Sequence, residues 1–389
     1  MSAARSSPGY MPQLDGLRAI AVLLVLIHHW VPEFTAYGRW GFLGVRCFFV
    51  LSGFLITGIL LDSRRLVEAG VTSNAFQFRQ FYIRRSLRIF PIYYLMLLVG
   101  CLVGMAGLKA TWGWHAAYLT NFYITSVNDW EGNYCHLWSL AVEEQFYLIW
   151  PAVMLLVPRQ WLRALFYAII AAAVLSRVGV VLYFGEGHLA AQVLTPCCLD
   201  SLVFGALAAL VSRTQPNGIA AACAAPWRAV GLIGAVLAAA GHVLRVQGLY
   251  TGALDVLEPL VQSMFFVWLV AVTARGATGW VGRLLEAPPL RYLGRISYGL
   301  YLYHMFVPYM TAIVFGKLGW EEPVGTWPNF ALHFTISLLV AALSERLLEA
   351  PFNRLKRFFP ALPAQRISPA PAHSAGAMLR PAPTASFQG

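Results

Sequence analysis

Residues 14–31 read LDGLRAIAVLLVLIHHWV, an apolar run that contains an arginine and two histidines. A membrane helix needs about 20 apolar residues, and an ionisable side chain within one is costly enough to indicate a polar cavity or pathway. Arg18 and His29 are separated by three helical turns, so they lie within roughly 20° of each other on one face and roughly 16 Å apart along the axis. We therefore expect this helix to direct a cation and an imidazole along one line, with His28 turned to another side.

The composition is that of a polytopic membrane protein. Of the 389 residues, 59% are hydrophobic and 12% are charged, and the mean hydropathy is +0.63. Soluble domains carry about 25% charged residues. The net charge of +11 indicates membrane topology rather than nucleic-acid binding, because Lys and Arg gather in cytoplasmic loops. The first apolar run is too long for a cleavable signal, and the sequence after it has no small-residue cleavage site.

The distribution of positive charge predicts the topology. With the N-terminus in the cytoplasm, most Lys and Arg fall on inner segments and only Arg39, Lys109 and Lys317 fall outside. We expect an all-α, multi-pass protein of the cytoplasmic (inner) membrane, with about ten transmembrane helices and both termini cytoplasmic. Residues 1–359 form one transmembrane domain, and the Ala- and Pro-rich residues 360–389 form a disordered cytoplasmic tail. The expected helices span residues 14–32, 41–61, 89–107, 138–157, 164–183, 197–212, 228–247, 256–274, 296–315 and 329–348.

The outer loop over residues 108–137 is long and rich in aromatic side chains. Such residues form an ordinary interfacial belt, but a cluster this dense also suits the roof of a cavity or the stacking of a sugar. The six cysteines show neither metal-ligand spacing nor a disulfide-rich pattern, so we expect no metal. A bridge on the outer side between Cys135 and Cys197 or Cys198 is left open.

The stretch FYIRRSLRIFP at residues 81–91 places two arginines on one helix face. Arg85 and Arg88 are three residues apart, at the cytoplasmic entry of the third helix. Such a pair anchors a helix by the positive-inside rule, or it grips an anionic group, because guanidinium forks bind phosphate through two hydrogen bonds. A phosphate-bearing donor such as a nucleotide thioester fits the second interpretation.

The stretch HLWSLAVEEQFYLIWP at residues 136–151 carries two adjacent acids within a membrane helix, which are costly there without a function. Ser139, Glu143 and Tyr147 recur every four residues and share a face. The carboxylate of Glu143 either orients a histidine, lines a proton path or belongs to a buried hydrogen-bond network.

Two further polar sets lie in apolar segments. Arg177 and Asp200 lie at similar depth on consecutive helices, which predicts a structural intramembrane ion pair. In GRISYGLYLYH at residues 294–304, Ser297, Tyr301 and His304 follow i, i+4, i+7 spacing and form one polar stripe. This stripe lines a polar cavity or supplies hydrogen bonds between helices.

These stretches together resemble the membrane-bound acyltransferase-3 family, which O-acylates glycans and other hydroxyl acceptors. The resemblance rests on LDGLRAIAV at 14–22 with His29, FFVLSGFLIT at 48–57, RSLR at 85–88 and WSLAVEEQFY at 138–147. The run at residues 294–304 adds a fifth element. The five patterns cover roughly residues 12–350, and their order is far more specific than any one of them.

The resemblance implies an acyl-CoA-dependent O-acyltransferase with no bound cofactor. Acyl-CoA, most commonly acetyl-CoA, is the implied co-substrate and binds from the cytoplasm. The acceptor is a glycan, a lipid-linked sugar or a macrolide, reached from the outer side or from membrane lipid. The family's proposed catalytic histidine corresponds to His29, its donor-contacting arginines to Arg85 and Arg88, its motif arginine to Arg18 and its first motif acid to Glu143.

The chain also departs from the family pattern. Many members carry an acid where this chain has Arg46, and an arginine where it has Cys198. We expect the first change to alter the outer mouth and the acceptor, and the second to leave Asp200 with Arg177 as its partner. Members with an extracytoplasmic hydrolase-like domain exist, and we expect this chain to be of the stand-alone type.

Acyl transfer from a thioester to a hydroxyl needs a base, a group that stabilises the oxyanion and a dry, aligned site. We expect Arg85 and Arg88 to hold the phosphates of acyl-CoA while His29 either deprotonates the acceptor or becomes acylated itself. In this scheme Glu143 either orients His29 or stabilises its imidazolium. A proton-coupled transporter or flippase that uses His29, Glu143 and His304 is the main alternative, and an acyl-CoA-gated sensor is a second one.

Overall fold

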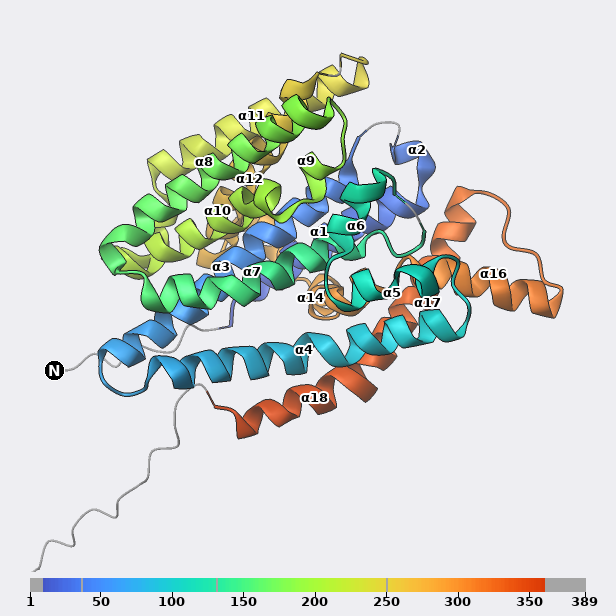
Figure 1. Cartoon of the computed structure of the whole chain (residues 1–389), viewed down its shortest axis with the longest axis horizontal. Coiled ribbons are helices and arrows are strands. Elements are labelled where there is room, and N and C mark those ends of the chain that lie inside the picture. The colour runs from blue at the N-terminus through green and yellow to red at the C-terminus, as the bar shows by residue number, and fades with distance from the viewer. Residues whose placement is uncertain (1–9, 36–37, 131, 250, 361–389) are drawn as a thin grey trace, which may run out of the picture.

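The computed structural model describes residues 10–35, 38–130, 132–249 and 251–360, and this part of the chain is helical with no strand (Figure 1). The expected tail at 360–389 therefore lies outside the described residues, apart from its first position. Seven helices are long and apolar enough to cross a membrane. Five of them are α3 (Trp40–Glu68), α4 (Asn74–Leu102), α8 (Arg159–Phe184), α11 (Ala225–Val246) and α12 (Gly252–Arg275). The other two are longer spans, Ala190–Thr214, which contains α10 (Thr195–Thr214), and Thr326–Phe358, which begins with α17 (Thr326–Ser344).

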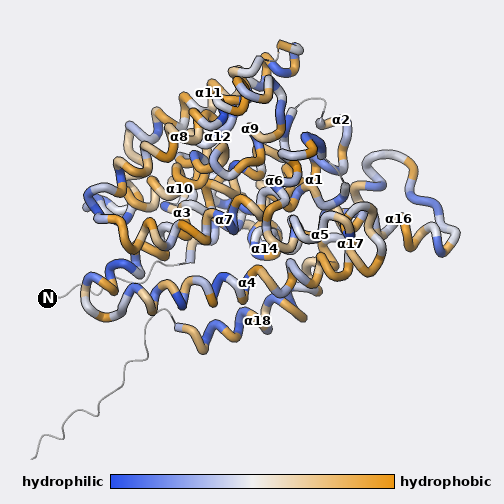
Figure 2. The backbone as a smooth tube through the Cα atoms, viewed as in Figure 1, coloured by the Kyte–Doolittle hydropathy of each residue, from blue (hydrophilic) through white to orange (hydrophobic). Residues whose placement is uncertain are grey.

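Two further helices, α1 (Pro12–Trp30) and α7 (Leu137–Leu156), are nearly as long but carry charged side chains in their apolar runs. Hydrophobic residues extend along the long helices in Figure 2, whereas hydrophilic residues gather at the turn between α3 and α4 and on α18. The fold is that of an all-α, multi-pass membrane protein. The remaining short helices are α2 (Pro32–Thr35), α5 (Leu108–Ala116), α6 (Thr120–Val127), α9 (Ala190–Val193), η1 (Gly218–Cys223), α13 (Gly279–Leu285), α14 (Pro288–Arg295), α15 (Ser297–Tyr303), α16 (Phe306–Leu318), η2 (Glu345–Glu349), α18 (Ala350–Arg354) and η3 (Leu355–Phe358).

Helix α4 begins much earlier than expected. The apolar pattern predicted a start at residue 89, but the helix starts at Asn74, where the Ser73 side chain caps it by accepting a hydrogen bond from the Phe76 amide at 3.2 Å. Arg85 and Arg88 therefore lie within a continuous helix rather than at its entry. In Figure 1, α4 runs along one edge of the molecule with α18 beside it.

The segment expected as one helix over residues 296–315 is broken between α15 and α16. Pro308 has no N–H to donate to the carbonyl of His304, four residues earlier. That carbonyl instead accepts a hydrogen bond from Nε1 of Trp30 on α1, at 3.2 Å. The break thus fixes residue 304 against the outer end of α1.

The outer segment at 108–137 is not an open loop, because α5 and α6 pack back against the bundle. Gln145 on α7 donates a hydrogen bond to the Tyr118 carbonyl at 2.7 Å. Asn121 on α6 is fully buried and donates to Thr195 at 3.1 Å. The ring of Tyr118 stacks on Tyr93 of α4, with centroids 4.4 Å apart. Tyr118 and Tyr134 therefore pack as part of the core, whereas Trp112, Trp114 and Phe122 are exposed.

Glycines set the closest helix contacts. A Cβ atom on Gly53 would lie 1.8 Å from the carbonyl oxygen of Leu202, and one on Gly205 would lie 2.0 Å from that of Val50. Helices α3 and α10 therefore approach backbone to backbone, as small residues permit in membrane bundles. All six cysteines are free, so the structure contains no Cys135 bridge to Cys197 or Cys198.

Candidate active site

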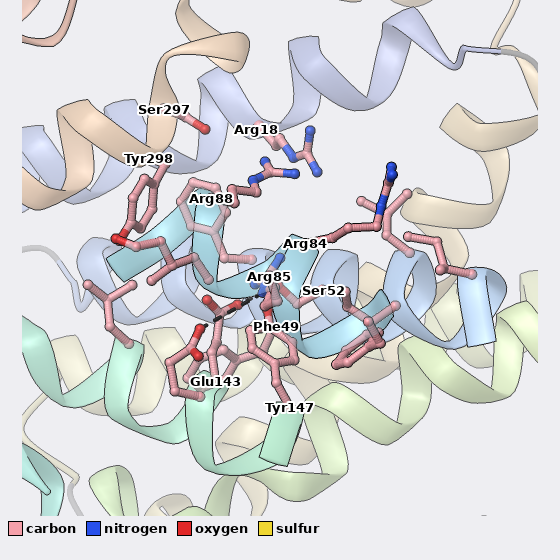
Figure 3. A pocket seen from close by; sticks show the side chains of 18 of the residues that line it. Arg18, Phe49, Ser52, Arg84, Arg85, Arg88, Glu143, Tyr147, Ser297 and Tyr298 are labelled. Atoms are coloured by element: carbon pink, nitrogen blue, oxygen red, sulfur yellow. Dashed lines mark hydrogen bonds and ion pairs between the residues drawn. The ribbon is translucent and has the colours of Figure 1, made fainter. Parts of the chain in front are cut away.

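A cavity of about 390 Å³ penetrates the bundle between α1, α3, α4, α7 and α15 (Figure 3). Most of the residues singled out from the sequence meet here, although they come from four separate helices. Arg18, Arg85, Arg88, Ser139, Glu143, Tyr147, Ser297 and Tyr301 all line the cavity.

Arginine side chains dominate its polar lining. In Figure 3 the guanidinium groups of Arg18 and Arg88 lie next to each other. Arg18 also forms an ion pair with Asp15, with 3.1 Å between Nη1 and Oδ1. The Arg88 side chain lines the cavity beside it. Arg85 lies below them, with its Cζ 3.8 Å from the centroid of the Tyr147 ring and its Nε 3.9 Å from Glu144. The cavity is therefore prepared for a ligand with several negative charges.

The sequence alone did not single out three charged residues of the cavity, Arg84, Glu144 and Lys356, nor Tyr298. Arg84 adjoins the identified pair, and its position in the basic run was the signal available for it. Glu144 was noticed only as the neighbour of Glu143. Tyr298 and Lys356 had no such signal, because Lys356 reaches the cavity from η3, which follows the last long helix. Five cationic side chains thus line the cavity beside two carboxylates, namely Arg18, Arg84, Arg85, Arg88 and Lys356 beside Glu143 and Glu144.

Glu143 has a different partner from the one expected. Its carboxylate accepts a hydrogen bond from the Ser52 hydroxyl, and Tyr147 donates to the same Ser52 oxygen at 3.0 Å. Ser52 belongs to the run at residues 48–57, so this contact joins two of the sequence patterns. The carboxylate is held by the cavity wall and makes no described contact with His29. The structure therefore does not support an orienting bond from Glu143 to His29.

A pair of hydroxyl groups closes the end of the cavity nearest to the histidines. Ser139 Oγ lies 2.5 Å from the hydroxyl oxygen of Tyr301, and both hydroxyls contact the carbonyl of His136, at 3.2 and 3.1 Å respectively. Ser297, one turn before Tyr301, lines the cavity at a different level. The polar stripe expected on this helix therefore does border the cavity, except at its last member.

That last member, His304, lies behind Tyr301 in a group of histidines. The ring of His304 is 4.9 Å from that of His29 and 4.7 Å from that of His136, measured between centroids. His304 is fully buried and does not line the cavity, contrary to expectation, because the helix break turns it towards α1. His29 also lies outside the cavity lining, on the far side of His304 from the hydroxyl pair.

Arg177 and Asp200 lie apart from the cavity. Arg177 Nη2 is 2.7 Å from Asp200 Oδ2, and both side chains are fully buried. Arg177 also donates to the carbonyls of Val256 and Cys197, at 2.8 and 2.6 Å. The guanidinium therefore ties α8, α10 and α12 together, which is a structural role.

The departure at Arg46 does not alter the outer mouth. Arg46 is 1% exposed, and its Nη1 lies 3.5 Å from the hydroxyl of Ser201, next to Asp200. Its charge is buried between α3 and α10, where it faces the buried Cys198 and Asp200. The two departures from the family pattern thus meet at one place in the core.

A metal site is not apparent. Within residues 10–35, 38–130, 132–249 and 251–360, no group of three or more His, Cys, Asp or Glu side chains is placed to hold a metal ion.

Comparison with known proteins gives a consistent result. A family model described as an acyltransferase domain matches residues 11–346. The chain is 31% identical over 395 residues to the peptidoglycan O-acetyltransferase OatA of Listeria monocytogenes, a match that covers 90% of this chain and 57% of that protein. It is 32% identical over 379 residues to the putative peptidoglycan O-acetyltransferase YrhL of Bacillus subtilis, covering 88% and 55%.

Similar proteins in Staphylococcus aureus are described as putative O-acetyltransferases, one of them 28% identical over 374 residues with 89% of this chain and 58% of that protein covered. The chain thus spans a little over half the length of these curated relatives. No solved structure matches the chain significantly.

Proposed function

Because the chain belongs to the acyltransferase domain family, we propose that it is a membrane O-acyltransferase. It moves an acyl group, acetyl in the simplest case, from cytoplasmic acyl-CoA to a hydroxyl of a glycan or a related acceptor. The observation that carries this proposal is the arginine-lined cavity that enters from the cytoplasmic half of the bundle and ends below three histidines.

The charges at the cavity fit the phosphates of a nucleotide thioester. Arg84 and Lys356 lie towards the cytoplasmic end, and Arg85 and Arg88 follow along α4. Arginine binds phosphate through two parallel hydrogen bonds, whereas lysine acts as a point charge. The Nε of Arg85 is buried and faces the Glu144 carboxylate at 3.9 Å, so the remaining N–H groups of this guanidinium are the ones that would bind the phosphates.

The inner wall of the cavity fits the pantetheine arm. Phe48, Phe49, Ile56 and Leu140 supply apolar surface beyond the arginines. The arm extends along this wall and brings the thioester to Ser139 and Tyr301, whose hydroxyls are the donors closest to the histidines. Donors that already face the carbonyl oxygen stabilise the charge that develops there.

The base in this scheme is His29, which His304 and Tyr301 separate from the cavity in this structure, so the scheme requires these two side chains to move aside when both substrates are bound. Its Nδ1 lies 2.8 Å from the carbonyl of Val25, an acceptor, so Nδ1 carries the proton and Nε2 keeps its lone pair. A neutral imidazole in this tautomer takes a proton from a hydroxyl at neutral pH. His29 lies near the outer end of α1, so the acceptor approaches it from the side opposite to the donor.

The acceptor class is supported by the relatives, two of which are described as peptidoglycan O-acetyltransferases. We propose a glycan for this chain on that basis. Lipid-linked sugars and macrolides are the other hydroxyl acceptors to be compared in the assay.

The test is release of free CoA thiol from acetyl-CoA by the protein in proteoliposomes, with the three acceptor classes supplied separately. We expect turnover that requires an acceptor and is strongest with a glycan. Substituting Arg85 and Arg88 with Gln should abolish it, whereas Arg79→Gln, an exposed position on the same helix, should not.

His29→Asn keeps a donor for the Val25 carbonyl but removes the base, and it should be inactive. The matched control is His28→Asn on the neighbouring residue. Proton-coupled solute flux without release of thiol would contradict the proposal and favour a transporter.

A further inference from the structure

The arginine-lined cavity continues past Arg88 to a second polar end. Gln80, Arg84 and Arg88 lie at four-residue intervals on α4 and all line the cavity, so this wall extends about 12 Å along the helix. In Figure 3 the Arg84 side chain reaches away from the adjacent guanidinium groups of Arg18 and Arg88. Lys356 joins the lining from η3. The cavity therefore suits an elongated ligand that carries negative charge at two separate places.

Backbone contacts fix Lys356 beside Arg84. Nη1 of Arg84 donates to the carbonyl of Phe359 at 3.0 Å and to that of Lys356 at 3.4 Å, so it caps the end of η3. Nε and Nη2 of Arg84 make no hydrogen bond to another described residue and remain available to a ligand. Lys356 lies beyond residues 11–346, the part that the acyltransferase family model matches. The segment that follows the last long helix of this chain therefore completes the cavity.

This end of the cavity carries more positive than negative charge. Arg84 and Lys356 donate their described hydrogen bonds to uncharged groups rather than to carboxylates. Arg84, Arg85 and Arg88 all lie close enough to repel the Lys356 ammonium, and the Glu349 carboxylate opposes them more weakly. Cations that are held together without matching carboxylates form a site for a strongly charged anion, such as a phosphate monoester.

Gln80 supplies a neutral polar group one helical turn from Arg84. It is 6% exposed, it lines the cavity, and its Oε1 is buried without a hydrogen-bond partner among the described residues. A buried amide oxygen is costly to leave unpaired, so we expect a donor on the ligand to meet it. A glutamine amide pairs with adenine by accepting from N6 and donating to N7. Phe81, the next residue, also lines the cavity and offers apolar surface to a base.

We propose that Gln80, Arg84 and Lys356 bind the 3′-phosphoadenosine end of the donor and so make the enzyme specific for coenzyme A thioesters, an inference that rests on the proposed function. Gln80 recognises the adenine, and Arg84 and Lys356 bind the 3′-phosphate. Arg85 and Arg88 remain for the diphosphate. An acyl group on the phosphopantetheine arm of a carrier protein has neither adenosine nor a 3′-phosphate, so it is a poor donor for this site.

The test measures the binding of CoA and of dephospho-CoA, which lacks only the 3′-phosphate, to the purified protein in detergent. We expect the wild type to bind CoA at least about tenfold more tightly, because hydrogen bonds to a charged group are worth that factor. Arg84→Gln and Lys356→Gln should each lose most of this preference by weakening the binding of CoA. Their affinity for dephospho-CoA should stay within about twofold of wild type, which shows that the rest of the site is intact.

Arg79→Gln on α4 and Arg357→Gln on η3 are the matched controls. Each removes one positive charge from an exposed position outside the cavity lining, so both should keep the wild-type preference for CoA. Gln80→Met keeps the volume of the side chain and removes its amide. It should weaken the binding of CoA at least about threefold and leave unchanged the binding of CoA whose adenine is deaminated to hypoxanthine.

Equal affinity of the wild type for CoA and dephospho-CoA, or no binding of CoA, would overturn the inference. Equal weakening of both ligands by Arg84→Gln and Lys356→Gln would also overturn it. The proposed function fails separately, if the wild type shows the preference for CoA but releases no thiol from acetyl-CoA in proteoliposomes. Conversely, an enzyme that uses acetyl-CoA and acetyl-dephospho-CoA with equal KM would retain the proposed function and lose this site.

Discussion

The guanidinium of Arg85 lies over the ring of Tyr147, with Cζ 3.8 Å from the ring centroid. One residue belongs to the RSLR run and the other to the end of WSLAVEEQFY, so two patterns that are distant in sequence share one wall of the cavity. The stack holds the guanidinium plane while its N–H groups remain directed at the cavity. A cation–π contact of this kind contributes about 0.5–2 kcal/mol.

This stack predicts different effects for two substitutions of Tyr147. Tyr147→Phe keeps the ring under Arg85 and removes only the hydroxyl bonded to Ser52, so the KM for acyl-CoA should change little. Tyr147→Leu removes the ring, and KM should rise about threefold to tenfold. Initial rates at varied acetyl-CoA concentration give the KM of each variant. A KM of Tyr147→Leu equal to that of Tyr147→Phe would show that the stack does not position Arg85.

Replacing Arg85 with lysine should impair donor binding although the charge is kept. Lysine offers neither the planar fork nor the stacking surface, so we expect KM for acyl-CoA to rise at least about tenfold. Arg79→Lys on the exposed face of α4 is the control and should behave as wild type. The prediction fails if Arg85→Lys retains wild-type KM.

The buried pair of Arg177 and Asp200 should contribute to stability rather than to turnover. Arg177→Met leaves a buried carboxylate without its cation and two carbonyls without their donor, which should cost about 3–5 kcal/mol. The double variant with Asp200→Asn should recover part of this loss, because no buried charge then remains unpaired. Thermal unfolding in detergent compares the three proteins, and a double variant less stable than Arg177→Met would contradict the argument.

The glycine contacts between α3 and α10 make a second stability prediction. Alanine at Gly53 or Gly205 forces a methyl group against a backbone carbonyl, so the helices must separate. We expect a loss of at least about 1–3 kcal/mol for each variant. Gly179→Ala on α8 points into open space and should be neutral or slightly stabilising. Thermal unfolding in detergent compares the stability of these variants with that of the wild type. Unchanged stability of Gly53→Ala would exclude tight packing where α3 and α10 cross.

His115 gives the outer segment a defined pH dependence. Burial lowers the pKa of His115 to about 4 from the ordinary value of 6.5. The unfolded chain therefore binds the proton first, and the stability of α5 should fall as the pH decreases from 6.5 to 4, by at most about 3 kcal/mol. The hydrogen-exchange protection factors over residues 108–127, which correct for the slower intrinsic exchange in acid, should be lower at pH 5 than at pH 7. In His115→Gln the difference in protection between pH 5 and pH 7 should shrink. If it is unchanged, a titratable group other than His115 causes the pH dependence.

The sequence predicted the segments of the bundle because long apolar runs have few other stable arrangements in a membrane. It also predicted eight residues that line the cavity, since polar side chains in apolar helices are retained where they meet one another. It misplaced the start of α4 because the amphipathic residues 74–88 lack an apolar run. It missed the break at His304 because that break depends on Pro308 together with a donor from Trp30.

Position within one helix follows from spacing, so the sequence by itself determined which residues of each segment are polar and which share a face. Contacts between helices depend on packing across the bundle, and only the tertiary structure decided them. It gave Glu143 the Ser52 hydroxyl as its partner, added Lys356 to the cavity and buried Arg46 beside Asp200. It also separated His29 from the cavity by His304 and Tyr301, because a side chain's neighbours on other helices are set by helix crossings that no local pattern encodes.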